Sequence, residues 1–285
     1  ARSWEQMPPI LDNPLFFHSA QGILFLTGAW FLCKAFPTTA FRKPLLLLLN
    51  LLFLLSFSAY VPLVVLGLAL CSFLLANAVS RYRNAAFVAL GAALLFATSQ
   101  LLNQPMSGRG IFVTPGGAVG NHLSFSFLAF SLISTFISVH RRELEPPSLL
   151  NHALLASFFP TAVSGPILDG KNFLQQLDSP YEAPNPREVV DRFTLGLLKK
   201  TVIADRLGLL YHDIFQAYQS GGSRLGFLLF YIYAFEVYFD FSGYTDMAVS
   251  AARIAGFRVR DRKSTRLNSS HSQQSRMPSS ALKKK

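Results

Sequence analysis

Three acidic residues lie close together in a strongly apolar segment near the end of the chain. Glu236, Asp240 and Asp246 fall within eleven residues of one another, inside the segment from Leu225 to Ala255. An acid in a membrane-spanning helix costs about 2.5–3.5 kcal/mol on insertion scales, so it usually faces a cavity, an ion pathway or a partner. Because Glu236 and Asp240 are four residues apart, they share one helical face. We therefore expect these acids to face a protein interior or a water-filled funnel.

Polar and aromatic residues complete this stretch. Tyr238, Ser242, Gly243 and Tyr244 lie among the acids, and we include them as candidates for lining the cavity or tunnel. A structural alternative is open at this point, in which the aspartates cap helices or pair with Arg253. A kink at Gly243 would favour that alternative, since an aspartate can then act as an N-cap.

The elements that must position these residues are helices in a membrane. The chain has 285 residues, of which 51% are hydrophobic and 14% charged, whereas soluble domains contain about 25% charged residues. Leu45–Tyr60, Val61–Val79 and Ala85–Leu102 contain no charge. Runs of ~20 apolar residues span a bilayer, and in lipid they must be helical to satisfy their own backbone amides. The sequence predicts an all-α polytopic membrane protein rather than buried helices of a soluble one.

The basic residues predict an orientation. Further spans are expected at Leu15–Cys33 and Leu123–Val139. If these five spans alternate, the three most basic loops fall on one side, which the positive-inside rule assigns to the cytoplasm. The N-terminus is then extracytoplasmic. The basic residues of the three loops are Lys34, Arg42 and Lys43; Arg81 and Arg83; and Arg141 and Arg142.

A helix break follows the fifth span. The apolar run Leu149–Phe159 is too short to span and ends at Pro160, after which Ser164, Gly165 and Pro166 continue the break. Proline removes an amide donor and glycine frees the backbone. Non-helical backbone at membrane depth is tolerated only inside protein or along a cavity. We predict a re-entrant segment, with an interfacial loop as the alternative.

A basic amphipathic helix is predicted from Arg187 to Gln216. It has an apolar side, and its polar residues include Lys199 and Lys200. Such a helix can lie in the cytoplasmic interface, where the two lysines would anchor it to anionic headgroups. Cys33 and Cys71 lie within apolar runs, so we expect packing residues rather than a disulfide or a metal site.

The last residues differ from the rest. Residues 261–285 contain seven basic residues and one acid, and therefore supply +6 of the formal charge of +11. Such a tail could bind anionic lipid or nucleic acid. However, Asp261-Arg-Lys-Ser-Thr-Arg-Leu-Asn-Ser-Ser-His271 and the final lysines resemble a translated sequencing adapter followed by poly-A. We interpret the tail as a cloning artefact, expect the natural sequence to diverge near Arg260, and expect no nucleic-acid partner.

Three ordered motifs resemble those of the membrane-bound O-acyltransferase family. Val237-Tyr-Phe-Asp-Phe-Ser-Gly-Tyr-Thr-Asp-Met-Ala-Val249 is similar to its signature. Phe193–Leu207 is similar to its G-x-x-K-K-x-x-I-A-D segment, and Phe159–Ile167 to its F-P-x-x-x-x-G-P segment. Leu123–Phe127 also agrees. The resemblance covers 123–259 and is nearest to the bacterial branch that acetylates alginate or transfers D-alanine to teichoic acid; residues before 120 fit only by hydrophobic pattern.

The resemblance implies a domain organisation and an activity. Residues 1–120 would be N-terminal transmembrane helices and 121–260 a partial acyltransferase core, in a bacterial inner-membrane protein. An acyl group, expected to be acetyl, would pass from a cytoplasmic donor to hydroxyls of an extracytoplasmic polysaccharide. The donor is a co-substrate, and neither a bound cofactor nor a metal is expected. Accessory acyl-transfer proteins are expected partners. Lys199 and Lys200 would then attract an anionic donor or carrier, as an alternative to lipid anchoring.

Departures from the family pattern limit what this chain is expected to do. Gly120-Asn121-His122 stands where relatives carry Pro-x-Gly, and His122 is expected to be an interfacial or capping residue. The family's catalytic histidine, a general base of the kind that contributes about 10²–10⁴ in rate, lies in a Trp-rich segment that would follow residue 260. We therefore expect the chain alone to be inactive.

Two other function classes compete with acyl transfer. An ion-coupled transporter or channel would also contain buried acids and broken helices. It would be expected to show an internal repeat, and neither the signature motif nor the Ser164-Gly165-Pro166 break has a second copy. A non-enzymatic scaffold would have no reason to place three acids in a membrane segment.

Overall fold

The protein is helical over nearly all of the residues that can be described. A computed structural model describes residues 17–57, 59–82, 85–103, 113–114, 117–118, 125–163, 165–219 and 226–259. Ser164, His122 and the tail 261–285 lie outside these residues, so the predictions made for them are not tested. The helices are α1 (Ala20–Ala35), α2 (Thr39–Leu55), α3 (Tyr60–Tyr82), α4 (Ala85–Asn103), α5 (Phe125–His140), α6 (Leu149–Ser157), η3 (Phe159–Thr161), α7 (Gly170–Leu177), α8 (Pro186–Leu198), η4 (Lys199–Ala204), α9 (Asp205–Gln219) and α10 (Gly226–Ile254).

The predicted apolar segments form helices α1 to α5 and α10. A two-residue antiparallel ladder, β1 (Val113–Thr114) with β2 (Gly117–Ala118), lies between α4 and α5. Of the part of the chain that is described, α3 is the one helix both long and apolar enough to cross a membrane by itself, while α1, α5 and part of α4 are shorter apolar helices. The all-α prediction is confirmed apart from that small ladder.

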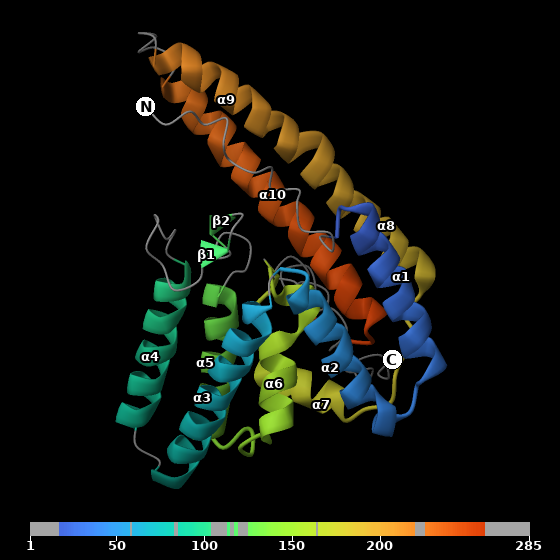
Figure 1. Ribbon diagram of the computed structural model, residues 1–285, viewed down its shortest axis with the longest axis vertical. Coiled ribbons are helices and arrows are strands. Elements are labelled where there is room, and N and C mark those ends of the chain that lie inside the picture. Colours follow the sequence, from blue (N-terminus) through green and yellow to red (C-terminus); the bar gives the residue numbers. More distant parts are fainter. Residues whose placement is uncertain are drawn as a thin grey trace, which may run out of the picture.

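The helices form two groups (Figure 1). In the first, α3 packs against α4, α5 and α6, and α2 packs against α6. In the second, α8, η4 and α9 run as one long helical segment beside α10. The far ends of α9 and α10 project beyond the first group, and no residue of α9 is buried. The two groups meet where α1 and η3 contact α10.

The predicted helix break is present, and a buried asparagine satisfies its backbone. After α6 the chain forms the short helix η3 and then irregular structure until α7. Asn50 of α2 is fully buried. Its Oδ1 accepts the Phe159 amide at 3.1 Å, and its Nδ2 donates to Ser157 Oγ at 3.1 Å. A buried amide without a partner would cost about 1–3 kcal/mol, so Asn50 makes this break tolerable in an apolar interior.

Hydroxyl groups of α5 satisfy the other end of the break. Ser131 Oγ accepts the Leu168 amide at 3.0 Å, and Ser134 Oγ donates to the Leu168 carbonyl at 3.1 Å. Gly170 lies so close to Thr135 Oγ1 that a side chain there would collide with it. The irregular backbone is thus held inside protein, which is the condition under which such backbone is stable in a membrane.

Arg42 occupies a different environment from the predicted cytoplasmic loop. It lies in α2, is 4% exposed, and donates to the carbonyls of Gln176 (2.7 Å), Ser179 and Gly256 (3.1 Å). Its guanidinium also stacks over the Phe257 ring, 4.7 Å from the centroid. Arg42 is therefore a structural cross-link between α2, the end of α7 and the end of α10. The loop prediction was wrong for this residue because apolar flanks alone do not reveal carbonyl partners more than a hundred residues away.

Replacing Asn50 by alanine should destabilise the fold by about 1–3 kcal/mol, since it leaves the Phe159 amide buried without a partner. Among the described residues, the side chain of the exposed Asn77 bonds to Phe73 of its own helix alone, so Asn77→Ala should change the free energy of unfolding by less than about 0.5 kcal/mol. Thermal unfolding of both variants in one detergent makes the comparison. Equal stability losses would show that Asn50 does not support the break.

Candidate active site between helices α8 and α10

Two glycines allow α8 and α10 to approach closely. A Cβ on Gly243 of α10 would lie 2.7 Å from the Gly196 carbonyl oxygen and 2.9 Å from the Lys200 amide nitrogen. A Cβ on Gly196 would meet the Gly243 oxygen at 2.6 Å. α10 continues unbroken through Gly243, so the alternative in which the helix breaks there and Asp246 acts as an N-cap is wrong. The glycine serves helix contact rather than helix breaking.

The predicted amphipathic helix is continuous but contains a π-helical segment. Lys199–Ala204 forms the π-helix η4 between α8 and α9. π-Helical turns are rare and are frequent at functional sites. Here the segment lies against α10, and both lysines at its start form ion pairs with acids of α10.

Asp246 is the centre of a buried ion cluster. The residue is 7% exposed. Oδ2 accepts from Lys199 Nζ, and Oδ1 accepts from Arg192 Nε at 3.2 Å and Nη2 at 3.1 Å. Lys199 Nζ also donates to Ser242 Oγ at 3.4 Å. The alternative in which Asp246 pairs with Arg253 is wrong, because Asp246 pairs with two cations of the neighbouring helical segment.

A second cluster lies one to two turns away on α10. Lys200 Nζ contacts Asp240 Oδ1 at 2.6 Å and Asp205 Oδ1 at 2.9 Å. Glu236 faces the same helical segment, since a Cβ on Gly208 of α9 would lie 2.9 Å from Glu236 Oε1. Lys199 and Lys200 are therefore partly buried and paired with acids. The acids face a neighbouring helix, as their cost in lipid required.

The remaining candidates divide between core and surface. Tyr244 is buried and stacks on Phe17 with centroids 5.7 Å apart, and Phe17 also contacts Phe159 of the break at 6.4 Å. Tyr238 is 57% exposed, and its ring packs edge-on against Phe239 of the same helix. Aromatic contacts of Tyr244 thus bring the signature segment and the helix break together.

The break residues surround this junction. Pro160 and Gly165 are buried and Pro166 is half-buried. A Cβ on Gly165 would lie 2.6 Å from Thr161 Cα, so only glycine fits there. The glycine is therefore required by the close approach of the Thr161 backbone, in addition to its role in breaking the helix.

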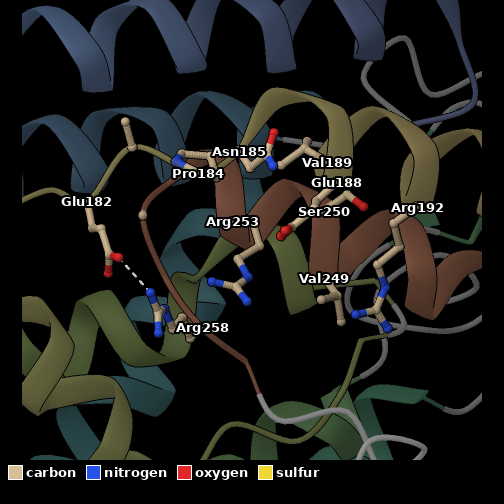
Figure 2. A pocket seen from close by; sticks show the side chains of 12 residues that line it. Glu182, Pro184, Asn185, Glu188, Val189, Arg192, Val249, Ser250, Arg253 and Arg258 are labelled. Carbon is tan, nitrogen blue, oxygen red and sulfur yellow. Dashed lines mark hydrogen bonds and ion pairs between the residues drawn. The ribbon is translucent and has the colours of Figure 1, made fainter.

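A cleft of about 380 Å³ opens beside the Asp246 cluster (Figure 2). It lies between the first turns of α8 and the last turns of α10, and Arg192 lines it while also pairing with Asp246. In the segment before α8, the Tyr181 hydroxyl donates to the Ile254 carbonyl at 3.1 Å. Burial raises the pKa of the Tyr181 phenol to about 12.

Sequence reasoning missed Arg192. A signal was present, because Arg192 precedes Lys199 by seven residues and so lies on the same helical face. Within the described residues no group of three or more histidines, cysteines or acids could hold a metal ion. The arrangement is an organic ion network, suited to holding one carboxylate in a fixed position.

Comparison with known proteins identifies the family. The sequence model of the membrane-bound O-acyltransferase family matches residues 43–277. The chain belongs to this family. The match includes all the segments that form the ion clusters and the helix break, so the resemblance drawn from the three motifs is confirmed.

Curated relatives of this acyltransferase-family chain align with up to about half of its length. It is 34% identical over 140 residues to a probable alginate O-acetylase of Pseudomonas aeruginosa, covering 48% of this chain and 26% of the relative. It is 34% identical over 117 residues to a peptidoglycan O-acetyltransferase of Helicobacter pylori (37% and 22%). It is 30% identical over 151 residues to a teichoic acid D-alanyltransferase of Streptococcus thermophilus (48% and 35%). The chain therefore spans only a minor part of the length of each of these relatives.

Gly243→Ala should destabilise the helix pair by about 1–3 kcal/mol, because the added methyl group collides with backbone of α8 and η4. A methyl group added to Gly67 of α3 would have no atom within 4 Å, so Gly67→Ala should be neutral or slightly stabilising. Thermal unfolding of the two variants checks this. A Gly243→Ala protein as stable as the Gly67→Ala protein would contradict the close approach.

Proposed function

We propose that the intact protein transfers an acyl group, most simply acetyl, to hydroxyls of an extracytoplasmic polysaccharide. The family membership supports acyl transfer, and relatives named for O-acetylation of alginate and of peptidoglycan support a polymeric acceptor. The observation that carries the proposal is the Asp246 carboxylate, buried within the signature segment and held by Lys199 and Arg192.

In this proposal Asp246 is a positioning residue rather than the group that attacks the substrate. A carboxylate that accepts hydrogen bonds from two cations is held in a fixed position, so it can orient polar groups of a catalytic chamber. The general base is a histidine expected after residue 260.

The placement in the cell is part of the same proposal. We infer a bacterial inner-membrane protein with five N-terminal spans and an extracytoplasmic N-terminus, which receives its acyl donor from the cytoplasm and works with accessory acyl-transfer proteins. The break at Pro160 would be re-entrant, and burial of Pro160 and Gly165 supports this. Family membership favours this activity over an ion-coupled transporter.

Asp246→Asn in the intact protein should lower polysaccharide acetylation without abolishing membrane insertion. The substitution removes the charge of the group that holds Lys199 and Arg192, and a hydrogen bond to a charged group contributes about 1.5–3 kcal/mol. The matched control is Asp191→Asn, which removes an exposed acid paired at i,i+4 with Arg187 and should have little effect. Acetyl content of the polysaccharide and protein in the membrane fraction are both measured. Unchanged acetylation would show that Asp246 is merely structural.

The source DNA provides a separate test of the expected histidine. Reading the frame past Arg260 should reveal a Trp-rich segment that contains a histidine. Replacing that histidine by alanine should abolish acetylation while leaving the protein in the membrane. A natural frame without such a segment would argue against acyl transfer by this mechanism.

A further inference from the structure

The cleft beside the Asp246 cluster has a lining rich in arginine. Arg192 comes from α8, Arg253 from the last turn of α10, and Arg258 from the segment after it. Figure 2 shows the three side chains around one space. Its volume of about 380 Å³ falls within the range of small-molecule sites, which is about 300–1,000 Å³.

Arg253 differs from the other two arginines in having no direct partner. Arg192 pairs with Asp246, and Arg258 Nη2 contacts Glu182 Oε1 at 2.6 Å. Within the described part of the chain, the Arg253 side chain forms no hydrogen bond or ion pair, although the residue is half-buried. A guanidinium remains charged at all physiological pH values and presents a planar fork of donors. The side-chain donors of Arg253 are therefore available to an acceptor group of a ligand in the cleft.

Two carboxylates of the lining, those of Glu182 and Glu188, oppose the positive charge near Arg253. Glu182 is neutralised by Arg258, and Glu188, in the first turn of α8, has no ion pair among the described residues. With Arg192 paired to Asp246 and Arg258 paired to Glu182, Arg253 and Glu188 are the charged lining residues for which the described part of the chain shows no direct ion pair. The N-terminal end of α8 adds a positive potential, while Glu188 opposes it. The planar donor fork of Arg253, rather than a net charge of the lining, is the feature that suits an oxyanion at this place.

We propose that this cleft binds a phosphate-bearing ligand whose phosphate pairs with Arg253. A phosphate has the geometry to accept two hydrogen bonds from one guanidinium, and its charge of about −1.5 to −2 exceeds that of a carboxylate. The cleft is larger than a phosphate, so it also accommodates the attached alcohol part. The phosphate belongs either to a soluble phosphate ester or to the headgroup of a phospholipid, which share this chemistry.

The test uses the full chain in detergent, with glycerol 3-phosphate as the soluble probe and isothermal titration calorimetry as the measurement. Arg253→Gln should weaken binding by about tenfold or more, the usual scale for a charge-assisted hydrogen-bonded pair. Glu188→Gln should strengthen it, because the opposing charge is removed. The matched control is Arg187→Gln, whose side chain is 89% exposed and paired with Asp191; it should change affinity by less than about twofold.

A second arm distinguishes the two sources of phosphate. The same variants are placed in nanodiscs of phosphatidylcholine with or without phosphatidylglycerol, and bound phosphatidylglycerol is counted by native mass spectrometry. Loss of binding in Arg253→Gln but not in Arg187→Gln supports the proposal for whichever probe shows it. Arg253→Lys keeps the charge but loses the planar fork, so its affinity should be intermediate. This variant shows whether weaker binding by Arg253→Gln comes from the lost contact rather than from misfolding.

The proposal is overturned if neither probe binds, or if Arg253→Gln and Arg187→Gln bind both probes equally. Binding is measured without acyl donor or polysaccharide. The outcome is therefore independent of whether the protein transfers acyl groups.

Discussion

The ion pairs of Asp246 with Lys199 and Arg192 are the interaction on which the arrangement of the second helix group depends. A carboxylate in an apolar segment must either be neutralised or be removed from lipid. Here α8 and η4 supply two cations, and the close approach at Gly196 and Gly243 brings them within reach. The residues of the signature motif therefore determine how α10 packs against α8 and η4.

The same constraint explains the polar residues elsewhere in the core. Asn50 satisfies the backbone where α6 ends, Ser131 and Ser134 satisfy it before α7 begins, and Arg42 binds three carbonyl groups near the ends of α7 and α10. Each of these side chains comes from a helix other than the one it supports. Polar residues in apolar helices therefore act here as cross-links, and they hold the irregular segments at fixed positions next to α10.

Arg192 connects the buried cluster with the adjacent cleft. It forms part of the cleft wall and also neutralises the charge of Asp246. A ligand that enters beside Arg253 would therefore lie about two helical turns from the signature carboxylate. A charged ligand in the cleft would therefore change the electrostatic potential at Asp246, since charges are screened weakly away from water.

Apolar runs were sufficient to predict the helices, because lipid imposes length and internal hydrogen bonding on each segment separately. Pro160 and Gly165 likewise predicted the break, and the motifs predicted the family. Which cation pairs with which acid was decided only by the tertiary structure. Lys199 and Asp246 are separated by 47 residues, and sequence spacing contains no information on which cation reaches which acid across two helices. The continuous helix through Gly243, the π-helical turn at Lys199 and the burial of Arg42 have the same origin, since each is stabilised by contacts with another element.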